Sequence, residues 1–167
     1  AVNAILTERD DTVMDAYRPL VPLFELMGEL FQVLNARRRK RGAIDFDLPE
    51  AEVLLDADGA IEAIVASERN VAHRLIEEFM LLANETVAAH LEQHQVPAMY
   101  RVHEAPDAKK VIDFEAFITT LGYSLAATGA DLRPMHFQKL VERMRGTPEE
   151  RPIAALMLRT MQKARYA

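Results

Sequence analysis

The sequence contains no cysteine, few chain breakers and no long apolar run. The absence of cysteine excludes disulfide bonds, thiolate zinc sites and cysteine nucleophiles, and it leaves the redox compartment open. Eight prolines and six glycines are too few for an all-β protein with many turns. Uncharged stretches are far shorter than the roughly 18 to 20 residues that a membrane-spanning helix needs. No basic segment followed by an apolar one opens the chain. We therefore expect no membrane insertion and no export, with the cytoplasm as the default location.

The residues that are present predict a helix-rich globular unit. Half of the 167 residues are hydrophobic and 28% are charged, and the two kinds are interspersed, which argues against disorder. The net charge is −6, from 20 Lys and Arg against 26 Asp and Glu. Such an acidic balance argues against a self-sufficient nucleic-acid binder, because those proteins usually gather a basic surface. A local exception is the consecutive basic run Arg37 to Arg41.

Two prolines divide the first part of the chain into helical segments. Pro19 and Pro22 do not fit deep inside a helix, because each lacks an N–H group and its ring clashes with the carbonyl four residues earlier. We therefore expect a break near Arg18 and a long helix that starts around Leu20. This helix should run into the basic run, whose charge suits the negative end of the helix dipole, and end at Gly42.

A β-hairpin and a second long helix are expected next. The apolar runs Glu52–Leu55 and Ala60–Val65 flank an Asp-rich turn that closes with Gly59, a pattern typical of a hairpin. Ser67 is a plausible N-cap for a helix that continues to about His94. That helix has an apolar face wide enough for the centre of a core.

The last third of the chain predicts a short strand and three further helices. The strand is expected within residues 98–103, and the helices over residues 106–122, 134–146 and 152–165. The expected fold class is α+β and predominantly helical, with several packed helices, a small β-hairpin and a short extra strand. We find no internal repeat, and we expect residues 1–167 to form a single unit.

The basic run and the aromatic residue that follows it are the first candidate site. Arg37, Arg38 and Arg41 are suited to hold phosphates, while the ring of Phe46 offers a face on which a base stacks. A basic run of this kind is more often a solvated helix end than a nucleic-acid patch. Phe46 is equally consistent with a core residue.

Polar residues on the second long helix form another candidate site. Glu77 and Asn84 are nearly eclipsed on an ideal helix, and Arg74 lies one turn before Glu77. Such a polar line beside a broad apolar face is consistent with the border of a substrate channel. The alternative is a solvated helix face on which Arg74 pairs with Glu78.

The predicted strand supplies a third candidate site, for binding an anion. The histidines do not supply a candidate metal site. Arg101 and His103 share one face of the strand, which suits anion binding, although His103 is also placed to cap the next helix. His90 and His94 have the spacing of a metal-binding pair but lack nearby carboxylate support, so we predict no metal site in this chain. No nucleophile elbow, phosphate loop, dinucleotide fingerprint or zinc signature occurs.

Several segments, in order and together spanning nearly the whole chain, resemble the RNB catalytic domain of the ribonuclease R and ribonuclease II family. They are Arg41–Phe46 (RGAIDF), Asn70–Met80 (NVAHRLIEEFM) followed by Ala83-Asn84, Tyr100–Glu104 (YRVHE) and Met157–Tyr166 (MLRTMQKARY). The resemblance implies a processive 3′-to-5′ exoribonuclease that hydrolyses single-stranded RNA with magnesium and releases nucleoside 5′-monophosphates. It implies RNA as the partner, with neither DNA nor a membrane.

The resemblance also implies that part of the active site is missing from these residues. In the family, the aspartates that hold the ions precede the segment matching Ala1, and a Ser-Pro-Ile-Arg-Arg motif follows the segment matching Tyr166. Neither occurs here. We therefore expect the central to C-terminal part of an RNB catalytic domain, inactive alone and without bound magnesium.

The resemblance assigns Glu77 to the first Glu of a Glu-Glu pair near the terminal nucleotides, which gives it a supporting catalytic role. The expected RNA-binding residues are Arg37, Arg38, Arg41, Phe46, Arg74, Asn84, Arg101 and His103. A rival hypothesis is a self-standing helical module that binds a protein partner and has no catalytic activity.

Overall fold

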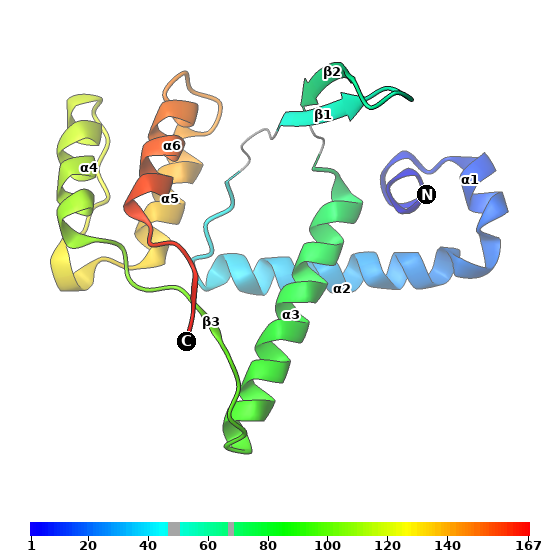
Figure 1. The fold of residues 1–167 in the computed structure, drawn as a ribbon, viewed down its shortest axis with the longest axis horizontal. Helices are drawn as coiled ribbons and strands as arrows, with labels where there is room; N and C mark the ends of the chain where they lie inside the picture. Colours follow the sequence, from blue (N-terminus) through cyan, green and yellow to red (C-terminus); the bar gives the residue numbers. More distant parts are fainter. Residues whose placement is uncertain (47–50, 67–68) are drawn as a thin grey trace. The chain divides into compact units, whose positions relative to one another are not determined.

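The computed structural model describes residues 1–46, 51–66 and 69–167, which fall into two compact units (Figure 1). Unit 1 comprises Ala1–Arg37 and Asp47–Val87, and unit 2 comprises Arg38–Phe46 and Ala88–Ala167. Helices make up most of the described chain, together with two small antiparallel sheets of two strands each. The expected α+β class, predominantly helical, is confirmed. The expectation of a single unit over residues 1–167 stays a prediction.

Unit 1 begins with short helical segments that lead into a long helix. They are η1 (Ala4–Glu8), α1 (Asp11–Ala16), η2 (Arg18–Leu20) and α2 (Val21–Lys40). The predicted break near Arg18 is confirmed, because Pro19 lies in the tight turn η2 and Pro22 is the second residue of α2. A missing N–H group costs little there, since the first N–H groups of a helix have no partner within the helix.

The predicted hairpin is also confirmed. Strand β1 (Ala51–Leu55) pairs antiparallel with β2 (Ile61–Ala66). In the turn between them, Oδ1 of Asp56 accepts hydrogen bonds from the backbone N–H groups of Asp58 at 3.0 Å and Ala60 at 2.8 Å. Local side-chain bonding of this kind explains why an Asp-rich sequence forms the turn.

Helix α3 (Val71–Gln93) follows the hairpin and ends within one residue of the predicted position. The side chain of Asn70 accepts from the backbone N–H groups of Ala72 at 3.0 Å and His73 at 3.3 Å, so Asn70 caps this helix. The predicted cap, Ser67, lies outside the described residues.

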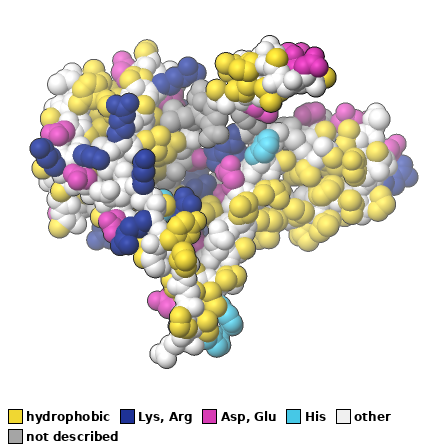
Figure 2. Space-filling model, in the orientation of Figure 1, with side chains coloured by type: hydrophobic (Ala, Val, Ile, Leu, Met, Phe, Trp, Pro, Cys, Tyr) yellow, Lys and Arg dark blue, Asp and Glu magenta, His cyan; other side chains and the backbone are white. Residues whose placement is uncertain are grey.

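The apolar faces of unit 1 are only partly buried. On α3, Leu75 is 1% exposed, whereas Ile76 and Met80 are about half exposed at 49% and 59%. Helix α2 likewise exposes Leu23, Leu26 and Leu30, and hydrophobic side chains cover much of unit 1 in Figure 2. The wide face of α3 is therefore not the centre of a core within this unit.

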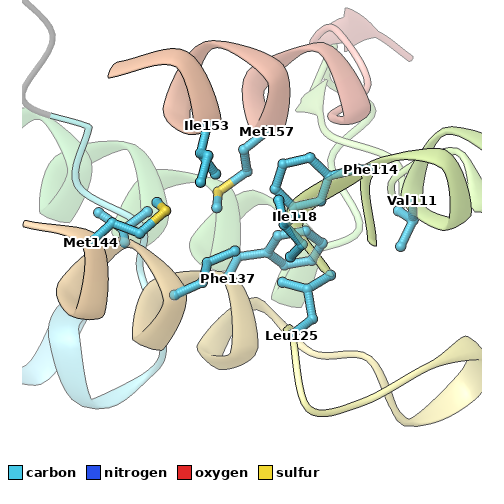
Figure 3. Close-up of a cluster of buried hydrophobic side chains, with 10 residues drawn as sticks. Val111, Phe114, Ile118, Leu125, Phe137, Met144, Ile153 and Met157 are labelled. Atoms are coloured by element: carbon cyan, nitrogen blue, oxygen red, sulfur yellow. The ribbon is translucent and has the colours of Figure 1, made fainter. Parts of the chain in front are cut away.

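Unit 2 contains the main hydrophobic core. Helices α4 (Ala108–Thr120), α5 (Pro134–Met144) and α6 (Glu150–Thr160) contribute nine of the ten side chains of the cluster shown in Figure 3, and Leu125, between α4 and the short turn η3 (Gly129–Asp131), contributes the tenth. Its members are Val111, Phe114, Ile118, Leu125, Phe137, Leu140, Val141, Met144, Ile153 and Met157. The side chain of Asp107 accepts from the N–H of Lys110 at 3.0 Å and caps α4, so the suggestion that His103 caps this helix was wrong.

The prediction for the last helix was wrong at its end. Helix α6 stops at Thr160 rather than Arg165, and strand β4 (Arg165–Tyr166) pairs antiparallel with β3 (Arg101–Val102). The backbones of Tyr100 and Ala167 exchange two further hydrogen bonds, at 2.8 and 2.9 Å. The pairing gives partners to the polar backbone groups of β3, which explains why the chain leaves the helix. The predicted strand at 98–103 is correspondingly shorter.

None of the helices in the described ranges combines the length and apolarity that crossing a bilayer requires.

Gly42, which ends α2, should tolerate no side chain. Its φ is +91°, and an added Cβ would lie 2.8 Å from the backbone nitrogen of Met135. Gly122 has a similar φ of +81° but open space around it. We expect Gly122→Ala to cost about 1 to 2 kcal/mol of unfolding free energy, from the left-handed backbone alone, and Gly42→Ala to cost more. Urea unfolding of both variants tests this, and equal losses would contradict the close contact.

Candidate nucleic-acid interface

A groove of about 990 Å³ opens in unit 2 beside its core. It is lined by the segment after Gly42, by β3 and the residues that follow it, by the start of α5 and by the chain after α6. Four side chains that line it are cationic or imidazole groups, Arg101, His103, Arg133 and Lys163, and the carboxylate of Glu104 lines it as well. We call this the basic groove. Arg101, His103, Arg133 and Lys163 are all exposed to solvent, so an anionic ligand can reach them.

The structure brings three of the predicted RNA-binding residues to the basic groove. Arg101 and His103 line it together with Phe46, although Phe46 is more than fifty residues earlier in the chain. Phe46 is half-buried, packs against the core cluster and also lines the groove. The ring therefore contributes to packing and also forms part of the groove wall, and its stacking on a base stays a prediction.

The basic run at the end of α2 is attached to α5. The guanidinium of Arg39 donates to Oε1 of Glu142 at 3.0 Å, and the side-chain amide of Gln138 donates to the Arg39 carbonyl at 3.0 Å. Arg37 and Arg41 are exposed, and Arg38 is half-buried. The run precedes the groove-lining residues in the sequence, and its role in RNA binding stays a prediction.

The other predicted residues lie on the part of α3 that belongs to unit 1. The guanidinium of Arg69 holds the carboxylate of Glu77 in a fork: Nε donates to Oε1 at 3.0 Å, and Nη2 donates to Oε2. The guanidinium of Arg74 lies 5.8 Å from the centre of the Phe31 ring, within the range of a cation–π interaction. Asn84 is exposed.

The neighbouring carboxylate, Glu78, serves a different purpose from Glu77. Glu78 is only 4% exposed, and it accepts a hydrogen bond from the side-chain amide of Asn35 on α2 at 2.8 Å. A buried carboxylate needs such donors, because an unpaired one would be costly. Glu78 therefore joins α2 to α3, while the side chain of Glu77 is 45% exposed.

The histidine pair at the C-terminal end of α3 makes local contacts. The rings of His90 and His94 stack with centroids 4.2 Å apart, and Nδ1 of His94 lies 2.8 Å from the carbonyl oxygen of His90. Across residues 1–46, 51–66 and 69–167, no three His, Asp or Glu side chains are grouped so that they would hold a metal ion. These residues therefore do not fit a magnesium site of their own.

Comparison with known proteins identifies the family. The family model described as the RNB domain matches residues 1–167. The chain belongs to the RNB domain family. The resemblance predicted from the sequence is thus confirmed, and nothing found supports the rival hypothesis of a stand-alone interaction module.

Curated relatives of this RNB segment are ribonucleases R. The segment is 44% identical to ribonuclease R of Aquifex aeolicus over 95% of its own length and 22% of the relative. It is 37% identical to ribonuclease R of Thermotoga maritima, over 99% of its length and 23% of the relative. It is 33% identical to ribonuclease R of Escherichia coli, over 96% of its length and 20% of the relative. The segment thus spans about a fifth of the length of these relatives.

Solved structures agree with this family assignment. The RNB segment matches Mycoplasma genitalium RNase R in complex with ribose-methylated single-stranded RNA, with a TM-score of 0.83 and 27% identity. The match covers 99% of the segment and 26% of that chain. The same RNase R in complex with double-stranded RNA matches with a TM-score of 0.83 and 27% identity, covering 99% of the segment and 29% of that chain.

Sequence reasoning missed Arg133, Lys163 and Arg69. Arg133 directly precedes α5, and Lys163 was assigned to a helix that in fact ends earlier. Arg69 precedes α3 and contacts the carboxylate of Glu77, eight residues later. Side-chain pairs on a helix are recognised in a sequence by a spacing of three or four residues, so this pair was not found. No local pattern identifies such contacts.

The hydrogen bond between Asn35 and Glu78 should stabilise unit 1. We expect Asn35→Ala to lower the free energy of unfolding by about 1.5 to 3 kcal/mol, the usual contribution of a hydrogen bond to a charged group. Asn84→Ala on the exposed face of α3 is the control, with an expected change within about 0.5 kcal/mol. Equal effects of the two variants in urea unfolding would contradict the structural role of Asn35.

Proposed function

We propose that this RNB segment is part of a processive 3′-to-5′ exoribonuclease that hydrolyses single-stranded RNA to nucleoside 5′-monophosphates. The observation that carries the proposal is the basic groove, in which a half-buried aromatic ring and several cationic side chains meet. The ribonuclease R relatives, and the RNase R structures with RNA, support the same assignment. Each of those relatives is much longer than the segment, so the activity is proposed for the protein that contains it.

In this proposal the basic groove binds a stretch of single-stranded RNA. Arg101, Arg133 and Lys163 contact phosphates, and the open part of the Phe46 ring stacks on a base. His103 adds a further hydrogen-bonding side chain. The arrangement agrees with the net charge of −6, because RNA is repelled by an acidic surface and binds where cations are concentrated.

The remaining predicted residues are proposed to contact RNA as well. Arg37, Arg38 and Arg41 would contact phosphates further along the strand. Glu77, Arg74 and Asn84 would border the channel near the terminal nucleotides, with Glu77 in a supporting catalytic role. No DNA partner and no membrane partner are proposed, and the proposed location is the cytoplasm.

Magnesium is proposed for the whole enzyme and not for this segment. The described residues offer no ligand set for the ion, and the family pattern places its aspartates outside this sequence. The segment would therefore bind and orient RNA, while the hydrolytic step depends on residues in the rest of the domain.

The isolated segment should accordingly have no exonuclease activity. Full-length protein with magnesium is expected to convert single-stranded RNA to nucleoside 5′-monophosphates, whereas the purified 167-residue chain is expected to release none. Thin-layer chromatography of labelled RNA measures the products, and a mock purification from the same host measures contaminating nuclease. Release of monophosphates by the chain above that background would refute the division of roles.

The ring of Phe46 is tested by separating its two contributions. Phe46→Leu keeps much of the apolar packing but removes the stacking surface. We expect this variant of the full-length protein to retain its melting temperature and to lose about 1 to 3 kcal/mol of RNA-binding free energy. A large decrease in melting temperature with unchanged RNA affinity would show that Phe46 contributes to the core alone.

The groove cations are tested through the salt dependence of binding. Each phosphate contact to a single strand contributes roughly 0.7 to the slope of log affinity against log salt concentration. Arg101→Gln together with Arg133→Gln should therefore reduce the slope by about 1.4. Arg9→Gln, which removes a surface ion pair with Glu25 in unit 1, is the control and should leave the slope unchanged. An equal slope in the groove variant and the wild type would exclude phosphate contacts there.

A further inference from the structure

The fork between Arg69 and Glu77 differs from an ordinary surface ion pair. Nε of Arg69 lies 3.0 Å from Oε1 and 3.2 Å from Oε2 of Glu77, while Nη2 donates to Oε2. Both carboxylate oxygens are therefore engaged by one planar guanidinium. The Arg69 side chain is 29% exposed. In the pair Arg9–Glu25, by contrast, a single nitrogen approaches a single oxygen at 2.7 Å, and the Arg9 side chain is 57% exposed.

A fork fixes the carboxylate more firmly than one hydrogen bond does. Two parallel donors set both the position and the plane of the carboxylate, and a partly buried guanidinium is less screened by water than an exposed one. Arg69 reaches Glu77 from the residue before the Asn70 cap, so it spans the first two turns of α3. The orientation of Glu77 is thus set by a residue outside the helix.

The two adjacent carboxylates of α3 are held from different directions. Glu78 is buried against α2 by Asn35. Glu77 is turned to a partly exposed position and held by Arg69. A partly exposed carboxylate beside an RNA strand would repel phosphates unless a cation compensated its charge. Arg69 supplies that cation on the same carboxylate.

We propose that Arg69 is a positioning residue for Glu77: it holds the Glu77 carboxylate in one orientation and offsets its charge toward passing phosphates. This inference rests on the proposed exoribonuclease function, in which Glu77 borders the RNA channel. Arg69 then acts through Glu77 and makes no phosphate contact of its own. The functional unit is the pair rather than Glu77 alone.

A double-mutant cycle in the full-length protein tests this inference. We would measure kcat and KM on a single-stranded oligoribonucleotide for Arg69→Ala, Glu77→Ala and the double variant. Misplacement of a positioned group costs on the order of 10-fold to 100-fold in rate. We expect a kcat loss of that order for Arg69→Ala, with no further loss in the double variant compared with Glu77→Ala. If the kcat losses of the two single variants multiply in the double variant, Arg69 acts independently of Glu77, and the proposal is overturned.

The salt dependence of RNA binding separates positioning from direct contact. The comparison is made in the Glu77→Ala background, in which no carboxylate charge remains to be offset, and there Arg69→Ala should leave the slope of log affinity against log salt concentration unchanged. A decrease of roughly 0.7 would assign Arg69 to a phosphate and overturn the positioning role. Arg9→Ala is the matched control, since it removes an ion pair of the same unit without touching α3.

Arg69→Lys keeps the charge but not the fork, and it replaces Arg69→Ala if that variant fails to fold. We expect it to retain the wild-type melting temperature while kcat falls. Wild-type kcat in Arg69→Lys, or a loss explained by melting temperature alone, would overturn the proposal. A wild-type protein without magnesium-dependent RNA degradation would instead refute the proposed exoribonuclease function, so the two failures are distinguishable.

Discussion

Two short strands from distant parts of the chain, Arg101–Val102 and Arg165–Tyr166, pair through their backbones, and the basic groove depends on this pairing. The pairing joins the strand that carries Arg101 to the chain after α6, and Arg101, His103 and Lys163 all line the groove. The helices α4, α5 and α6 provide the buried cluster on which these segments rest. A two-residue ladder thus places side chains that a continued helix would have directed elsewhere.

Charge is distributed in this segment so that an acidic chain presents cations locally. The net charge is −6, yet the groove gathers Arg101, Arg133 and Lys163 around a half-buried ring. Glu104 also lines the groove, but its carboxylate accepts a hydrogen bond from Arg165 at 2.8 Å. The local balance of charges, rather than the total, decides where a polyanion binds.

Helix α3 illustrates how neighbouring residues of one type acquire different roles. Glu77 and Glu78 are adjacent in sequence, but successive helical residues point about 100° apart, so one faces α2 and the other does not. Burial makes the Asn35 hydrogen bond a structural requirement for Glu78. Partial exposure leaves Glu77 accessible, with Arg69 fixing its orientation.

The sequence by itself determined the elements whose signals are local. Pro19 and Pro22 predict the break before α2, and the Asp-rich turn that closes with Gly59 predicts the hairpin. Each of these depends on hydrogen bonds or steric contacts within a few residues. The RNB resemblance likewise came from short segments, and the family model confirms it.

Only the tertiary structure decided which distant residues meet. The end of α6 was predicted wrongly because helix propensity competes there with a strand partner some sixty residues away, as the Arg101–Tyr166 register shows. For the same reason the sequence offered Phe46, Arg101 and His103 as separate candidates, and it gave no sign of Arg133, Lys163 or Arg69 in their company. Pairing and packing over such separations depend on the whole fold, and no local pattern encodes them.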